Sequence, residues 1–273
     1  LDQVTAFDLY IQPYHNQPPV LYRNAKHPFT EAVKARLSEY NVEFLLISTD
    51  QEQAYQEYLE NNLPAILKDP GLPLEDRTSA LYQSALGLVK ATLANSQSGE
   101  VVSRSGKLVE HMVEYIFHDR RVFQSLMKVT SFDYYTYTHC VNTFIFSTML
   151  AQRLGFSEKA TRDLGHGVLL HDIGKGQIDP EILNSREELT DQEWVEMKKH
   201  PRYGFDILSQ EEGTCDIVLD IALHHHEKIN GTGYPDGLKG NDISVWARIA
   251  AIVDIFDAIT TERSYKGAIG TFP

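Results

Sequence analysis

Histidine and aspartate side chains gather in one part of the sequence. Seven of the eleven histidines lie within fewer than ninety residues, at positions 139, 166, 171, 200, 224, 225 and 226. The pair His171-Asp172 follows the apolar run 168–170, and Asp254 follows the apolar run 249–253. A buried imidazole or carboxylate is costly to desolvate unless it is paired or bound to metal. Mixed imidazole and carboxylate ligands suit iron, manganese, zinc and similar ions, so these residues indicate a metal site.

The remaining histidines have a simpler interpretation. A single histidine on a helix is more often a surface or hydrogen-bonded residue than a ligand, and this interpretation is given to His15, His27, His111 and His166. A second His-Asp pair, His118-Asp119, is followed directly by Arg120 and Arg121. That context is typical of a charged surface turn or helix, so the pair is not expected to bind metal.

A glycine-rich loop follows the double histidine His225-His226. It reads Glu-Lys-Ile-Asn-Gly-Thr-Gly-Tyr-Pro from position 227 to 235. Two close glycines permit backbone conformations that are closed to other residues, and Pro235 stiffens the exit. Such a loop can bring backbone N–H groups and the Tyr234 hydroxyl near a phosphate. We therefore expect Gly233 and Tyr234 to contact substrate.

With these residues in view, the chain from about Tyr135 to Lys266 resembles the HD-GYP subgroup of the HD superfamily of metal-dependent phosphohydrolases. The matching segments are Tyr135–His139, His171–Lys175, His200-Pro201, His225–Pro235 and Asp254–Ala258. Arg263-Ser264-Tyr265-Lys266 is similar to the family's Arg-Pro-Tyr-Lys stretch, with Ser264 in place of proline. The resemblance covers about half the chain and says little about residues 1–70.

The resemblance implies an all-α catalytic domain that hydrolyses cyclic di-GMP to linear pGpG and in some members onward to GMP. Carried over by position, the metal ligands would be His139, His171, Asp172, His200, His225, His226 and Asp254. Asp172 would bridge two ions, because a carboxylate offers two oxygens. Some members have a ligand glutamate where this chain has Tyr135, so we expect two ions, iron or manganese, rather than three.

The same resemblance assigns further roles. Asp172 and Lys175 would be catalytic: two ions bridged by Asp172 would activate water, and Lys175 would stabilise charge on the phosphoryl oxygens. Lys175, Arg263 and Lys266 would contact phosphate or guanine. For Asp257, three residues after Asp254, two interpretations stay open: it orients a ligand histidine, or it is a carboxylate on the helix surface.

Two other functions remain open at this point. One is a cyclic di-GMP sensor that acts through partners with little turnover. The other is a phosphodiesterase for a different phosphoester, such as cyclic GMP-AMP or a simple nucleotide. The sequence does not distinguish guanine from adenine.

The sequence predicts that mostly helices position these residues, in a mainly α fold. Residues 1–70 are expected to form a small α+β regulatory or docking domain, residues 71–125 a helical linker region, and residues 126–273 the catalytic domain. The chain ends at Pro273, before the final helices usual in the family. Strands are expected at 4–11, 19–22 and 42–48, helices at 30–40 and 50–61, and a proline-rich linker at 63–73. Later helices are expected at 77–94, 108–117, 136–154, 157–170, 191–200, 202–208, 216–226 and 245–261.

Composition limits the classes of function. The 273 residues allow one large domain and a smaller one. A net charge of −13 argues against a broad nucleic-acid surface. Two cysteines exclude a disulfide framework and fit a reducing cytoplasm. No secretory signal pattern opens the chain, and no membrane span is expected. Possible partners besides cyclic di-GMP are a second copy, through helices between 77 and 117, and proteins bound by residues 1–70.

Overall fold

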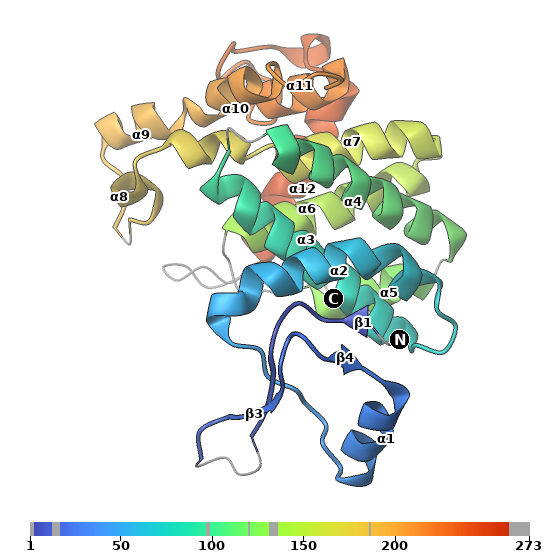
Figure 1. The fold of residues 1–273 in the computed structure, drawn as a ribbon. Helices are drawn as coiled ribbons and strands as arrows, with labels where there is room; N and C mark the ends of the chain where they lie inside the picture. The colour runs from blue at the N-terminus through green and yellow to red at the C-terminus, as the bar shows by residue number, and fades with distance from the viewer. Residues whose placement is uncertain are drawn as a thin grey trace. The chain divides into compact units, whose positions relative to one another are not determined.

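Helices dominate the computed structural model, which describes residues 3–12, 17–96, 99–119, 121–130, 136–185 and 187–261 (Figure 1). The chain forms two compact units, Leu1–Lys68 and Asp69–Pro273. Among the described helices, none is long and apolar enough to cross a membrane. The mainly α fold with a small α+β unit at its N-terminus agrees with the prediction.

The first unit combines two short antiparallel strand pairs with helices. β1 (Gln3–Val4) pairs with β4 (Pro28–Phe29), and β2 (Leu9–Ile11) pairs with β3 (Val20–Arg23). α1 (Glu31–Glu39) begins as predicted at Thr30, whose side chain accepts a hydrogen bond from the Val33 N–H. The turn η1 (Thr49–Gln51) leads into α2 (Glu52–Lys68).

Three predictions for this unit are wrong. The single strand expected at 4–11 is two strands, Gln3–Val4 and Leu9–Ile11, which pair with different partners. The expected strand at 42–48 contributes a single bridge, between Leu46 and Tyr10, and Phe44 in its middle is 76% exposed. Strand propensity without a surface to cover does not make a strand. The expected linker at 63–73 starts too early, because α2 continues through Pro64 to Lys68. Burial of Leu63 and Leu67 in that last stretch outweighs the hydrogen bond that the proline cannot donate.

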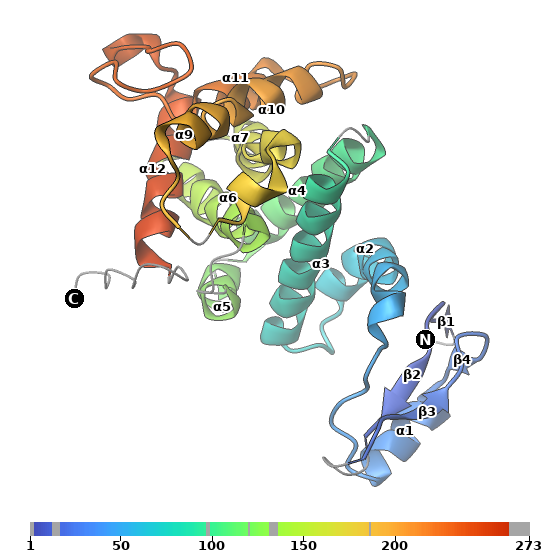
Figure 2. The same ribbon diagram turned by 90° about the vertical axis from the view of Figure 1, so that its left-hand side faces the viewer.

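The second unit is a bundle around α6 (Thr136–Arg153) and α7 (Glu158–Leu170). Its other elements are α3 (Leu74–Ala94), α4 (Gly99–His118), α5 (Arg121–Val129), η2 (Ile173–Gln177), α8 (Pro180–Leu183), α9 (Asp191–Met197), α10 (His200–Leu208), α11 (Asp216–His224), η3 (Gly240–Asp242) and α12 (Val245–Thr260). Helices α3 and α4 contact the α6–α7 pair on one side, and α11 and α12 contact it on the other (Figure 2). The helices of the predicted linker region 71–125 thus belong to this bundle.

Local sequence signals set the helix boundaries. The Ser157 side chain caps α7 by accepting from the Ala160 N–H, and Thr190 forms a capping box with Glu193 at the start of α9. At its other end α7 is deeply buried: Leu170 lies in one apolar core cluster and Val168 in another. The next two residues, His171-Asp172, are therefore held inside the protein at the end of a packed helix.

Candidate metal centre

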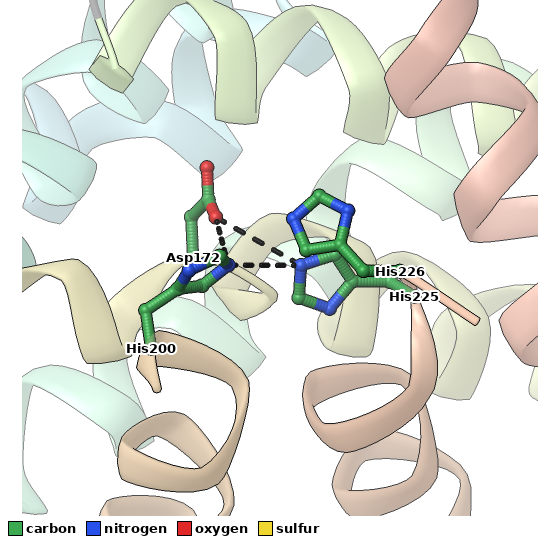
Figure 3. Close-up of side chains that lie close together, drawn as sticks. All are labelled: Asp172, His200, His225 and His226. Atoms are coloured by element: carbon green, nitrogen blue, oxygen red, sulfur yellow. Dashed lines mark hydrogen bonds and ion pairs between the residues drawn. The ribbon is translucent and has the colours of Figure 1, made fainter. Parts of the chain in front are cut away.

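The structure brings together all seven residues predicted to bind metal. They form two groups in which the candidate ligand atoms lie within 4.8 Å of one another. The first group is Asp172, His200, His225 and His226 (Figure 3), and the second is His139, His171 and Asp254. Five parts of the second unit supply them: α6, the α7–η2 junction, the start of α10, the end of α11 and the middle of α12.

The Asp172 carboxylate lies between the two groups. Its Oδ1 atom is 3.3 Å from His200 Nε2 and 3.9 Å from His225 Nε2, both in the first group (Figure 3). Its Oδ2 atom is 3.4 Å from His171 Nε2 in the second group. Each oxygen of this carboxylate therefore faces a different group.

Asp254 joins the other side of the cluster. Its Oδ1 atom lies 3.0 Å from His139 Nε2, and its Oδ2 atom lies 3.7 Å from His226 Nδ1. The apolar residues before it on α12, Ile249, Ala250 and Val253, are buried. The helix thus carries this carboxylate to the cluster while its neighbours pack in the core.

Backbone carbonyls fix the orientation of three imidazoles. Nδ1 of His171 donates to Val168 O (2.6 Å), that of His200 to Met197 O (2.7 Å) and that of His225 to Ile221 O (3.0 Å). A carbonyl oxygen only accepts, so in each ring Nδ1 carries the proton and Nε2 presents its lone pair to the cluster. This arrangement is typical of histidines that bind metal.

Several hydrogen-bond acceptor atoms of the cluster have no donor facing them. His200 Nε2 and His225 Nε2 lie 3.3 Å apart with their lone pairs facing each other. His171 Nε2 and Asp172 Oδ1 are fully buried and have no hydrogen-bond partner among the described residues. Leaving such an atom unsatisfied costs about 1–3 kcal/mol. A bound cation would satisfy these atoms, and the mixture of nitrogen and oxygen donors fits a transition metal.

The protonation states also fit metal binding. Burial disfavours the charged form of Asp172, but the Lys175 ammonium holds its pKa well below the ordinary value. Burial lowers the pKa of His171, and lowers that of His226 to about 3. At neutral pH the carboxylate is therefore ionised and these imidazoles are neutral, which are the forms that bind metal ions.

Lys175 and Tyr234, which the sequence analysis predicts to contact substrate, lie beside the cluster. Lys175 Nζ donates to Asp172 Oδ2 at 2.6 Å. The Tyr234 ring centroid is 4.8 Å from that of His226, and Lys198 Nζ lies 5.8 Å from the Tyr234 centroid. Burial raises the pKa of Tyr234, so its hydroxyl keeps its proton and can donate a hydrogen bond.

Glu227 is a functional residue that the sequence analysis did not assign. Its carboxylate is buried in the glycine-rich loop, where Oε1 accepts from the N–H groups of Asp236 and Gly237 and Oε2 from that of Leu238. A Cβ on Gly233 would lie 2.5 Å from Glu227 Cα, so only glycine fits there. Glu227 thus folds the loop that carries Tyr234. An acid directly after a double histidine, inside a turn-rich segment, was the available signal.

The structure decides between the two interpretations of Asp257. Its carboxylate is 1% exposed, and Oδ2 accepts from His139 Nδ1 at 2.6 Å. Asp257 therefore orients a predicted ligand, and the helix-surface interpretation is wrong.

The second His-Asp pair lies apart from the cluster. His118 is exposed and bonds to Glu114 O, and Asp119 pairs with Arg121 at 2.7 Å. Predictions for His15, Tyr135, Arg263, Ser264 and Lys266 fall outside the described residues and stay predictions.

Comparison with known proteins agrees with this geometry. Residues 122–271 match the HD domain family. Cyclic di-GMP phosphodiesterase PA4108 of Pseudomonas aeruginosa is 35% identical over 195 residues, which are 70% of this chain and 47% of that protein. The cyclic di-GMP phosphodiesterase response regulator RpfG of Xanthomonas campestris pv. campestris is 42% identical over 121 residues, 44% of this chain and 32% of that protein. A 3'3'-cGAMP-specific phosphodiesterase 2 of Vibrio cholerae is 39% identical over 132 residues, 48% and 25% of the two chains.

The chain spans less than half the length of these curated relatives. Among solved structures, Bd1817, a HDG"Y"P protein from Bdellovibrio bacteriovorus, is similar with a TM-score of 0.67 over 97% of this chain and 86% of that one. At 24% identity this likeness supports the fold. The family match covers 150 of the 273 residues and includes all seven clustered residues. The chain therefore belongs to the HD domain family.

Proposed function

We propose that the chain is a metal-dependent phosphodiesterase that hydrolyses cyclic di-GMP to linear pGpG, with GMP as a further product. The observation that carries the proposal is the buried cluster of acceptor atoms, in which His171 Nε2 and Asp172 Oδ1 have no hydrogen-bond partner among the described residues. The names of the cyclic di-GMP phosphodiesterases of Pseudomonas and Xanthomonas support the choice of substrate.

The site would hold two ions, iron or manganese. Two observations support this number: the ligand atoms fall into two groups, and Asp172 turns one oxygen toward each. Bound ions of this kind lower the pKa of coordinated water and polarise phosphoryl oxygens. In the first group His200, His225 and His226 would hold an ion with Asp172. In the second, His139, His171 and Asp254 would do so.

Residues beside the ligands would bind and polarise the substrate. The Lys175 ammonium lies at the ligands and would offset negative charge that develops on the phosphoryl oxygens. The protonated Tyr234 hydroxyl and the backbone near Gly233 would contact the nucleotide. Arg263 and Lys266 would contact phosphate or guanine from farther along the chain.

The test is hydrolysis of cyclic di-GMP by protein purified without oxygen or chelators and supplied with iron or manganese. Wild type and His118→Ala are expected to turn over at similar rates, since His118 lies outside the cluster. His171→Ala is expected to be inactive and depleted in metal. Wild type that binds both cyclic di-GMP and metal, yet hydrolyses nothing, would instead support the sensor function.

A second candidate substrate is 3'3'-cyclic GMP-AMP. The observation that favours it is the set of Vibrio cholerae relatives named as specific for 3'3'-cGAMP. Competition between the two dinucleotides in one reaction measures the preference directly. If kcat/KM is higher for cyclic GMP-AMP than for cyclic di-GMP, then cyclic GMP-AMP is the preferred substrate.

Several wider assignments remain proposals. They are a cytoplasmic location, a homodimer formed through helices between 77 and 117, and a regulatory or docking role for residues 1–70. Sedimentation of the full chain tests the dimer.

A further inference from the structure

A series of buried hydrogen bonds runs from α3 to His139, one of the predicted ligands. The Tyr82 hydroxyl on α3 donates to Asn142 Oδ1 on α6 at 3.1 Å. Asn142 Nδ2 donates to Asp257 Oδ1 on α12 at 3.1 Å. Asp257 Oδ2 accepts from His139 Nδ1 at 2.6 Å. None of these four side chains is more than 2% exposed, so water does not compete for the bonds.

The direction of each bond follows from the one before it. The Asp257 oxygen accepts a hydrogen bond from Asn142, so the Asn142 amide turns its NH₂ toward Asp257 and its oxygen toward Tyr82. That oxygen needs a donor, which the Tyr82 hydroxyl supplies. Thr261 Oγ1 donates to Asp257 Oδ1, the oxygen that also accepts from Asn142, at 3.2 Å. Both carboxylate oxygens are thereby held in place, and His139 Nε2 is turned toward Asp254.

We propose that Tyr82 and Asn142 are positioning residues of the metal centre, which act on His139 through Asp257. The proposal rests on the proposed function, because it assumes that His139 binds an ion. Partners of this kind fix the ring orientation of a ligand histidine and raise its basicity. A helix far upstream of the ligands in the chain would therefore contribute to metal affinity.

The same helix also packs against the turn that follows Asp172. The C-terminal end of α3 contacts η2, the turn that carries Lys175. A Cβ built on Gly176 in that turn would lie 2.9 Å from Leu93 O and 3.0 Å from Ser96 Oγ. α3 thus borders both the His139 side and the Asp172–Lys175 side. It lies outside residues 122–271, the segment that matches the HD domain family.

The test compares single-hydroxyl and single-amide variants of the full chain. Tyr82→Phe removes the first donor and keeps the ring, and Asn142→Leu removes the amide with little change in volume. Tyr115→Phe is the matched control, because the Tyr115 hydroxyl on α4 is buried without a hydrogen-bond partner among the described residues. Asp257→Asn is the reference for loss of the carboxylate that bonds to His139.

Mn²⁺ affinity is measured by competition with a chelator, and the stability of the metal-free proteins by urea unfolding. Loss of an outer partner typically weakens metal binding about 10–100-fold, which is expected for Asp257→Asn and Asn142→Leu. One bond farther out, Tyr82→Phe is expected to weaken binding about 3–10-fold, a fraction of that range. Tyr115→Phe is expected to bind as wild type. The weakening is expected at one ion of the pair, since the series reaches only His139.

A purely structural role would give a different pattern. Tyr82→Phe and Asn142→Leu would then unfold at lower urea concentration yet bind Mn²⁺ as wild type, which overturns the proposal while the metal centre stands. Wild type that binds no Mn²⁺ would overturn the metal centre and this assignment together. If Asn142→Leu does not fold, Tyr82→Phe alone decides, because it deletes one atom.

Discussion

Lys175 compensates a charge that the protein could not otherwise bury. Asp172 is 1% exposed, and its pKa is held well below the ordinary value, so its carboxylate is ionised. The Lys175 ammonium, 14% exposed, is 2.6 Å from Asp172 Oδ2. In the metal-free protein this contact supplies a positive charge beside that carboxylate. Metal ions would supply more, so Lys175 would stabilise the fold of the metal-free protein and, under the proposed function, the reaction of the metal-bound one.

The variant Lys175→Met tests this role. It is expected to lower the unfolding free energy of the metal-free protein by about 3–5 kcal/mol, because it leaves a buried charge unpaired. Added Mn²⁺ should restore most of the loss, and the hydrolysis rate should stay low. Urea unfolding with chelator and with Mn²⁺ measures the loss of stability and its recovery, and a hydrolysis assay measures the rate. Lys159→Met, which breaks the exposed pair with Asp163, is the control and should change little. Equal losses in the two variants would refute the role.

At the scale of elements, the approach of η2 to α10 brings Asp172 to His200. A Cβ on Gly174 would lie 2.0 Å from His200 O and 2.5 Å from Gly204 N. Both are backbone atoms, which cannot move aside as a flexible side chain can. Gly174 therefore sets the distance between the turn after Asp172 and the helix that begins at His200.

Gly174→Ala is accordingly expected to push η2 and α10 apart. Overpacking of this kind costs about 1–3 kcal/mol, and Mn²⁺ affinity should fall with stability. Gly106→Ala in α4 is the control, since the nearest atom to its Cβ would be 3.6 Å away. That change should stabilise the helix by about 0.5–1 kcal/mol. Urea unfolding and chelator competition on both proteins give the comparison. Normal Mn²⁺ affinity in Gly174→Ala would show that the turn spacing is unimportant.

Glu227 allows the loop to be tested separately from the ligands. In Glu227→Gln the NH₂ group would face the Leu238 N–H, so one bond to a charged acceptor is lost and two donors meet. Such bonds contribute about 1.5–3 kcal/mol each, so binding of cyclic di-GMP should weaken about tenfold or more. Metal content should stay at the wild-type level. Equilibrium binding and metal analysis measure these effects, with the exposed Glu212→Gln as control. Parallel loss of metal would mean that Glu227 supports the ligands rather than the loop.

Local patterns predicted most of the helices of the second unit, because caps and helical periodicity lie within a few residues of one another, and the family resemblance supplied the seven clustered residues. The helices that begin at Ser157, Thr190 and Ser244 have caps of this kind. α5 was not predicted as a separate helix. The contacts made by Tyr82 and Asn142 could not be predicted, since they join distant positions: Asn142 and Asp257 are 115 residues apart, and Tyr82 and Asn142 are 60 apart. Spacing along the chain carries no signal for such pairs.

At the scale of the whole molecule, stability also depends on titratable groups outside the site. His166 on α7 is such a group: it is partly buried against α4, and its Nε2 lies 2.9 Å from Ser105 Oγ. Ser105 gives its own proton to Val102 O at 2.6 Å, so its oxygen accepts from the histidine. Nε2 therefore carries a proton, and burial lowers the pKa of the imidazole below the ordinary 6.5, which favours its neutral form.

The sign of the pH dependence follows from that depressed pKa. Above about pH 6.5 the histidine is mostly neutral in both the folded and unfolded chain. As pH falls below 6.5 the unfolded chain takes up a proton that the folded chain resists, so the unfolding free energy decreases. The slope from one such group is at most about 1.4 kcal/mol per pH unit. The decrease continues until the pH reaches the folded pKa.

His166→Gln separates this contribution from that of the clustered histidines. The glutamine amide can still donate to Ser105 Oγ, but it does not titrate. Wild type and variant share every other histidine, so the difference between their unfolding free energies isolates His166. Measured by urea unfolding with chelator from pH 8 to pH 5, the variant should lose less stability on acidification than wild type. The two curves should diverge below about pH 6.5, where the unfolded histidine begins to bind its proton. Curves that stay parallel over the whole range would mean that His166 accepts a proton as readily in the folded protein as in the unfolded chain.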